Sequence, residues 1–174
     1  VCATEKNTQP FIDHNIVEQK KVAVIPPLVK IHQPPSSSHK NTYPRLADHY
    51  PKLLICGGLH TFYGSEFLLQ CLPFVLERWP QALMTFAGAY ALGEEEKYEK
   101  KCQSIKEHVY FAGGLSHSEM LGLMDMCDVF IRATRAESYG LSVIEAASLQ
   151  KPILLSNIEQ RQVLQDLISY HLFE

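Results

Sequence analysis

The sequence predicts an α/β domain, a doubly wound Rossmann-like parallel sheet with helices on both faces. Five short runs are apolar except for one threonine, and segments with helical spacing lie between them. Runs that are apolar on both faces are typical of parallel strands covered by helices on each side. Strand and helix alternate about five times, which is the order expected of a doubly wound sheet.

The expected strands follow one another at regular intervals. They are residues 53–56, 83–87, 109–112, 129–131 and 153–155. An earlier β-type run, Val22 to Ile25, stops at a Pro-Pro pair, and a Pro/Ser-rich polar stretch at 33–41 has almost nothing to bury. We therefore expect residues 22–51 to be a crossover and linker rather than part of the sheet.

The expected helices are assigned from apolar spacing and capping residues. An apolar stripe from Phe67 to Trp79 ends at a proline, and Glu94 to Lys106 is charged enough to be a surface helix. Ser116 with Glu119 three residues later forms a capping box. A Met- and Leu-rich stripe at 120–127, which we expect in the core, and the segments 143–149 and 163–168 complete the set.

Composition excludes several functional classes. The chain has 174 residues and a formal net charge of −3, which disfavours nucleic acid or an anionic membrane surface as a partner. No run reaches the ~18 apolar residues of a membrane span. The five cysteines are widely spaced, and the eight histidines form no pair with metal-ligand spacing. We expect free thiols, no metal site and a cytoplasmic location; peripheral membrane association of a longer protein stays open.

One segment, Arg135 to Ala147, places groups that could bind a phosphorylated ligand. Glu137 follows a strand, Gly140 lies where a helix begins, and Glu145 comes just over one helical turn later. A glycine at a helix start lets a phosphate reach backbone N–H groups, and the helix dipole favours an anion there. Sugar and ribose hydroxyls could then donate to the two carboxylates. A well-capped helix after an acidic loop residue is the alternative.

The same segment resembles the signature of family 4 retaining glycosyltransferases of the GT-B fold, in which seven residues separate two glutamates and include an aromatic-Gly-Leu. Here the signature is Glu137, Tyr139-Gly140-Leu141 and Glu145. Passages similar to the family occur in order at 55–64, 109–119 and 152–156. The resemblance runs from about Val22 to Ser156.

The resemblance implies a nucleotide-sugar-binding domain, one half of a GT-B enzyme. Such an enzyme moves a hexose from a nucleotide diphosphate to an acceptor hydroxyl with retention of anomeric configuration. Glu137 would be catalytic and contact the donor sugar, and Glu145 would bind the ribose. The other donor-binding residues implied are Gly58, Gly64, Gly114, Leu115, Arg135, Ser138, Tyr139, Gly140 and Leu141. No metal and no other cofactor is implied.

The sequence departs from the family at the phosphate loop. The family has an Arg directly after the first Gly and a Lys before the last, where this chain has Gly58 and Tyr63. Charge-assisted contacts to a leaving diphosphate stabilise the transition state by several kcal/mol. Either Arg135, or as second choice Arg132, supplies positive charge from the other side of the cleft, or the chain is a non-catalytic nucleotide-sugar-binding or scaffold module.

The resemblance also implies a domain organisation. Residues 1–21 would be a remnant of an N-terminal domain, 22–51 the crossover and linker, and 52–174 the donor-binding domain, truncated at its C-terminus. The acceptor, a glycan, lipid or other hydroxyl compound, would be bound by the missing domain, so we expect no transferase turnover from the chain alone. A nicotinamide- or flavin-binding domain is the weaker alternative, because no Gly-x-Gly-x-x-Gly follows the first strand. Base, sugar and oligomeric state stay open.

Overall fold

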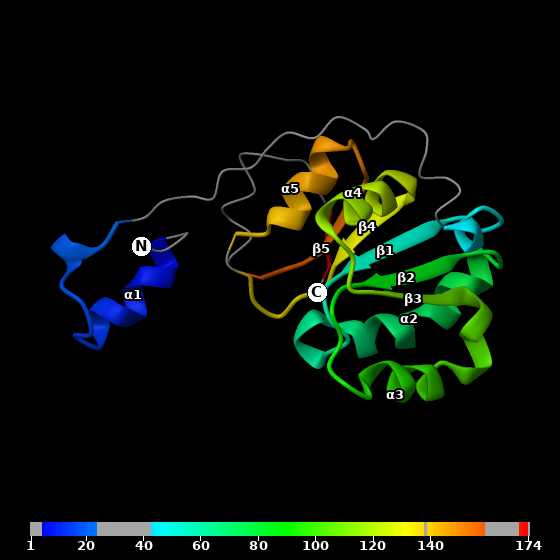
Figure 1. The fold of residues 1–174 in the computed structure, drawn as a ribbon, viewed down its shortest axis with the longest axis horizontal. Coiled ribbons are helices and arrows are strands. Elements are labelled where there is room, and N and C mark those ends of the chain that lie inside the picture. The colour runs from blue at the N-terminus through cyan, green and yellow to red at the C-terminus, as the bar shows by residue number, and fades with distance from the viewer. Residues whose placement is uncertain (1–4, 24–42, 138, 159–170, 174) are drawn as a thin grey trace.

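A single parallel sheet organises the chain, with strand order β3-β2-β1-β4-β5-β6 (Figure 1). The computed structural model describes residues 5–23, 43–137, 139–158 and 171–173. The strands are β1 (Lys52–Cys56), β2 (Leu83–Ala87), β3 (Val109–Gly113), β4 (Val129–Arg132), β5 (Ile153–Ser156) and β6 (His171–Phe173), and every pairing between neighbours is parallel. The predicted fold class is confirmed.

Helices cover both faces of this sheet. One face carries α2 (Ser65–Arg78) and α3 (Glu94–Lys101), and the opposite face carries α4 (His117–Met126) and α5 (Leu141–Ser148) (Figure 1). Successive residues of a strand point to opposite faces. In β1, Leu54 accordingly packs in a core with α4 and α5, whereas Ile55 packs in a second core with α2. Both faces of the central strands are therefore buried.

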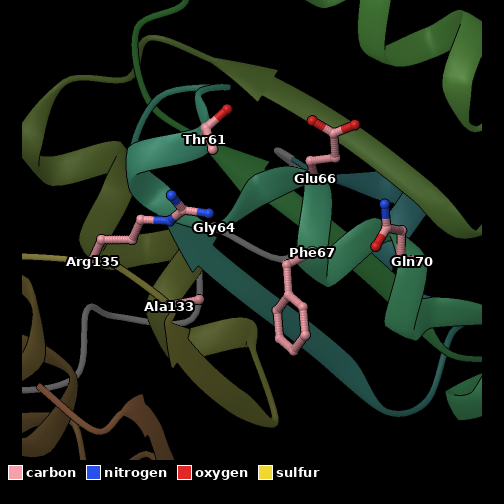
Figure 2. Close-up of a pocket in the computed structure, with 7 residues that line it drawn as sticks. All are labelled: Thr61, Gly64, Glu66, Phe67, Gln70, Ala133 and Arg135. Atoms are coloured by element: carbon pink, nitrogen blue, oxygen red, sulfur yellow. The ribbon is translucent and has the colours of Figure 1, made fainter. Parts of the chain in front are cut away.

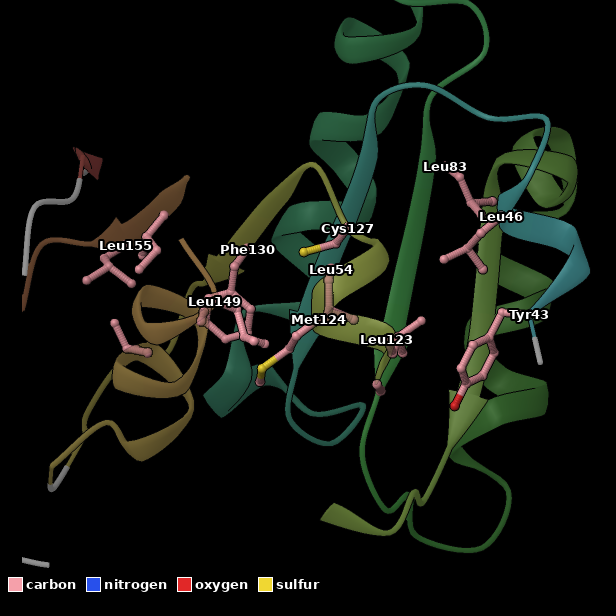
Figure 3. Packing of buried hydrophobic residues seen from close by; sticks show 14 residues of the cluster. Tyr43, Leu46, Leu54, Leu83, Leu123, Met124, Cys127, Phe130, Leu149 and Leu155 are labelled. Atoms are coloured by element: carbon pink, nitrogen blue, oxygen red, sulfur yellow. The ribbon is translucent and has the colours of Figure 1, made fainter. Parts of the chain in front are cut away.

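The core beneath α4 and α5 confirms the prediction for the Met- and Leu-rich stripe. Leu123, Met124 and Cys127 are buried there against Phe130 of β4 (Figure 3). Burial raises the pKa of the Cys127 thiol to about 12. Cys56, Cys71, Cys102 and Cys127, the four cysteines in the described part of the chain, are free thiols.

The predicted stripe of α2 is wrong at its two ends. Leu68, Leu69 and Leu72 are buried, but Phe67 is 48% exposed and Trp79 46% exposed. Phe67 lies seven residues before Phe74, which is 72% exposed, so the two share a side of the helix that is open to solvent. An apolar stripe this broad includes more residues than one helix face can bury.

Two further predictions need correction. The surface helix expected to reach Lys106 ends at Lys101. A 3₁₀ segment, Gln103–His108, follows it and is kinked at Ile105, where the backbone has the non-helical values φ −128° and ψ 19°. Tyr98 of that helix is buried, so the helix is not wholly solvated. The capping box is confirmed, since Ser116 Oγ accepts from the Glu119 N–H and the Glu119 carboxylate accepts from the Ser116 N–H. Strand β6 was not predicted.

The N-terminal part lies to one side of the sheet (Figure 1). It contains α1 (Glu5–Asp13) and a 3₁₀ turn, Gln19–Lys21. Two more 3₁₀ turns, Pro44–Leu46 and Thr61–Tyr63, flank β1. Val22 and Ala23 form no strand, while the rest of that β-type run, the Pro/Ser-rich stretch and the helix expected at 163–168 lie outside the described residues. Among the helices described, none is long and apolar enough to span a bilayer.

The packing of α2 gives a stability prediction. Leu72→Ala should lower the free energy of unfolding by about 2–5 kcal/mol, because Leu72 is fully buried and its loss opens a cavity. Phe74→Ala on the same helix should change it by no more than about 0.5 kcal/mol. Urea unfolding followed by circular dichroism measures both, and equal effects would contradict the orientation of α2.

Candidate functional site

The strand order reverses between β1 and β4. From β1 the chain proceeds outward to β2 and β3 on one side, and then returns to place β4 on the other side of β1. Ligands of open α/β sheets bind outside the carboxyl ends of the strands at such a switch point. Cys56 ends β1 and Arg132 ends β4, so these two residues mark the candidate site.

Arg132 bridges the two strand ends. Its Nη1 donates to the carbonyl oxygen of Cys56, its Nε donates to Glu137 Oε2 at 2.9 Å, and its Nη2 lies 2.8 Å from the same oxygen. The guanidinium also lies 5.4 Å from the centre of the Tyr63 ring, within cation–π range. The side chains of Arg132 and Glu137 are each only 13% exposed. Their charges are therefore poorly screened by solvent.

The loop after β1 lies against this pair. Gly64 is the N-cap of α2 and has φ 72°. A Cβ there would lie 2.5 Å from the carbonyl oxygen of Ala133, so only glycine fits. A Cβ at Gly58 would lie 3.0 Å from the carbonyl oxygen of Ala89, and the Ser65 hydroxyl donates to the Gly58 carbonyl. The loop thus passes so close to the backbone of Ala133 and Ala89 that its course depends on these two glycines.

The N-terminus of α5 meets the same place. Gly140 is its N-cap, with φ 72° and ψ 45°, and Leu141, the first helical residue, is 43% exposed. Burial raises the pKa of the Cys56 thiol. The nearby Arg132 charge and a hydrogen bond with Ser142 lower this pKa, and the negative charges of Glu145 and Glu137 raise it. The end of β1 therefore lies near the start of α5, both predicted glutamates and Arg132.

Glu145 has a partner that the sequence analysis missed. The Nε2 atom of His117, at the start of α4, lies 2.8 Å from Glu145 Oε1. The Glu145 side chain is 17% exposed and that of His117 is 60% exposed, so the pair sits at the rim of the site. No spacing rule links residues 28 positions apart, and only the packing of α4 beside α5 brings them together.

The remaining predicted residues are distributed around this centre. Gly114 is exposed and Leu115 half-buried, both after β3, Tyr139 is half-buried before α5, and Ser138 lies outside the described residues. Arg135 is exposed, and its backbone N–H donates to the Phe62 carbonyl at 3.0 Å. Its side chain extends along the start of α2, beside a hollow of about 450 Å³ that Thr61, Glu66 and Phe67 also line (Figure 2).

The structure thus pairs the second-choice arginine with Glu137. The signal in the sequence was an arginine directly after the buried run Val129-Phe130-Ile131, at the carboxyl end of a strand. A charge in that place needs partners. Within the part of the chain that the structure describes, no three His, Cys, Asp or Glu side chains are grouped to hold a metal ion.

Similar proteins are glycosyltransferases and a spore coat protein. The chain is 30% identical over 112 residues to spore coat protein SA of Bacillus subtilis, covering 60% of this chain and 30% of that protein. It is 27% identical over 107 residues to a glycogen synthase of Mycobacterium tuberculosis, and the match covers 62% of this chain and 26% of that protein. It is 28% identical over 105 residues to a phosphatidyl-myo-inositol mannosyltransferase of Mycobacterium leprae, and the match covers 59% of this chain and 27% of that protein. The chain thus spans less than a third of these relatives.

Solved structures share the fold. Anabaena Alr3699/HepE in complex with UDP and glucose superimposes with a TM-score of 0.76 at 18% identity, covering 98% of this chain and 48% of that one. WaaG, a glycosyltransferase of lipopolysaccharide biosynthesis, also superimposes with a TM-score of 0.76 at 18% identity. This match covers 99% of this chain and 48% of that one. The fold is that of one Rossmann-like half of a GT-B glycosyltransferase. The family model for glycosyl transferases group 1 matches residues 50–173, and the chain belongs to that family.

Proposed function

We propose that this chain is the nucleotide-sugar-binding domain of a retaining glycosyltransferase that moves a hexose from a nucleotide diphosphate to an acceptor hydroxyl. The observation that carries the proposal is the convergence at the switch point of the N-terminus of α5 with Glu137 and Glu145. A helix N-terminus attracts phosphate, and carboxylates accept hydrogen bonds from sugar hydroxyls. The two kinds of group together match a sugar joined to a diphosphate.

In this proposal each part of the site has its own role. The backbone N–H groups of residues 139–141 bind phosphate at the start of α5, with the Gly58 to Gly64 loop opposite them. Glu137 contacts the donor sugar, and Glu145 accepts from the ribose diol. The segment Gly114-Leu115 after β3 lies near the base. No metal is needed, because charge on the leaving diphosphate is stabilised by positive groups of the protein.

The names of the similar proteins support hexose transfer and indicate which nucleotide to test first. Two of the relatives are a mannosyltransferase and a glycogen synthase, and the HepE structures hold UDP or UDP-glucose. We propose that the acceptor is bound by a domain outside this sequence, since the chain covers 48% of the matched GT-B structures. The chain by itself would then bind the donor without transferring its sugar.

Binding of nucleotides with and without a ribose 2′-hydroxyl tests the role of Glu145. In calorimetric titrations with UDP, GDP and ADP, the chain should bind one nucleotide, and Glu145→Ala should weaken that binding about tenfold, the value of one hydrogen bond to a charged group. The corresponding 2′-deoxynucleotide should bind the unsubstituted chain more weakly than the ribonucleotide. Glu145→Ala should remove that difference.

Two variants control this experiment. Glu77→Ala removes an exposed carboxylate from the last turn of α2, at the other end of the strands, and should change nothing. His117→Ala removes the 2.8 Å partner of Glu145 but keeps the carboxylate, so the preference for ribose should persist. An equal preference for ribose in Glu145→Ala and the unsubstituted chain would reject the assignment, and no binding of any nucleotide would reject the proposed function.

A non-catalytic binding or scaffold module is the second candidate. The observation that favours it is the composition of the loop after β1, where Gly58 and Tyr63 stand in place of two expected cations. The space at Gly58 is also restricted, because a Cβ there would lie 3.0 Å from the Ala89 carbonyl oxygen. A module that binds a nucleotide sugar without stabilising its departure needs fewer positive groups.

Restoring the loop cations tests whether this loop lies at the diphosphate. Tyr63→Lys, alone and together with Gly58→Arg, should raise affinity for the bound nucleoside diphosphate about tenfold, because each adds a charge-assisted contact. Phe74→Lys adds the same charge on an exposed part of α2 and should have no such effect. If affinity does not rise in either loop variant, the loop does not face the diphosphate.

A further inference from the structure

We propose that Arg132 is the diphosphate-binding cation of this site, held in position by Glu137 and the Cys56 carbonyl before the donor binds. This inference rests on the proposed function and assigns one of its residues. It differs from the expectation drawn from the sequence, which placed Arg135 first.

The position of the guanidinium is the first argument. Arg132 ends β4, yet its side chain crosses to β1 and donates to the carbonyl of Cys56. Its Nη1 would lie 3.3 Å from a Cβ placed on Gly57, the first residue of the glycine loop. A positive charge therefore lies between that loop and the start of α5, where the proposed diphosphate would bind.

The surroundings of the guanidinium are the second argument. Glu137 Oε2 accepts a hydrogen bond from Arg132 Nε at 2.9 Å and lies 2.8 Å from Arg132 Nη2. The two side chains are each 13% exposed. An arginine fork that holds a carboxylate can hold phosphate oxygens in a similar geometry. Because the guanidinium is largely desolvated, its charge is poorly screened and would interact strongly with an arriving anion. Donor binding would let Glu137 accept from sugar hydroxyls while the diphosphate takes the guanidinium.

Tyr63 is the third argument. Its ring lies 5.4 Å from the Arg132 guanidinium, and its Cδ1 would lie 2.8 Å from a Cβ on Gly57. A lysine in place of this tyrosine would put a second positive charge beside the first, at a cost in the absence of an anion. The aromatic residue and the arginine therefore fit one arrangement, in which the strand end supplies the cation and the loop supplies a ring face for it.

Arg135 is in a weaker position for this role. It is exposed, and it lines the hollow beside Phe67 on the side of α2 (Figure 2). An exposed charge is screened by water and contributes less to an anion contact than a desolvated one. Substitution of Arg132 by glutamine should therefore affect diphosphate binding more than the same substitution of Arg135.

The experiment compares each nucleoside diphosphate with its monophosphate, using UDP/UMP, GDP/GMP and ADP/AMP and the 174-residue chain. Arg132→Gln should lower affinity for the bound diphosphate about 10- to 100-fold, the value of a charge-assisted contact, and should lower the ratio of diphosphate to monophosphate affinity. Arg135→Gln should lower the ratio by less than about threefold. Arg78→Gln, an exposed arginine in the last turn of α2, should leave it unchanged.

Two more variants protect the test against loss of folding. Arg132→Lys keeps the charge but not the fork, so its ratio should lie between those of the unsubstituted chain and Arg132→Gln. Adding Tyr63→Lys to Arg132→Gln returns one positive charge to the same place and should restore part of the lost diphosphate affinity. Thermal unfolding of every variant shows that a folded chain is being titrated.

The outcomes separate this inference from the proposal beneath it. An unchanged diphosphate to monophosphate ratio in folded Arg132→Gln, or a larger loss in Arg135→Gln, would overturn the role of Arg132 while leaving the donor site intact. A lower ratio with rescue by Tyr63→Lys would establish it. If the unsubstituted chain binds no nucleotide, the proposed function fails, and the role of Arg132 fails with it.

Discussion

The parallel pairing of β1 with β4 is the constraint on which the rest of the site depends. Their register, Leu53 with Val129 through Ile55 with Ile131, sets the two carboxyl ends side by side. Arg132, the next residue of β4, can therefore reach the carbonyl of Cys56, the next residue of β1. A shift of this register by one residue would turn the arginine side chain to the opposite face of the sheet. The position of Glu137 depends on the same pairing, because Arg132 holds it.

The fold was predictable because each central strand is buried on both faces. Runs such as Leu53–Cys56 and Leu83–Ala87 contain no polar residue facing solvent, and burial on both faces requires helices on both sides. The errors have a common cause. The spacing of apolar residues on a helix predicts a stripe, but it does not show which edge of a broad stripe faces the sheet. Phe67 and Trp79 were therefore assigned to the core although both are exposed. Strand β6, with three residues, is too short for any pattern.

The site was predictable where it depends on local geometry and unpredictable where it depends on packing. A glycine between a strand and a helix predicts a helix start that a phosphate could approach, and Gly140 is indeed the N-cap of α5. Which arginine lies beside Glu137 is a different problem. Arg132 and Arg135 are five and two residues from Glu137, and sequence distance does not show which of them contacts it. The turn after β4 brings the more distant residue into contact.

Stability alone does not account for an arginine at the end of β4. Taking a guanidinium and a carboxylate out of water costs more than their attraction often returns, and apolar residues of similar volume in such places are commonly as stable or more so. The neighbouring strand positions, Val129 to Ile131, show that this part of β4 packs with apolar side chains. Arg132 and Glu137 interrupt that pattern at the switch point of the sheet, where ligands of this fold class bind. Under the proposed function this placement has a reason, because the donor's diphosphate and sugar would meet at the switch point and would bind these two charges.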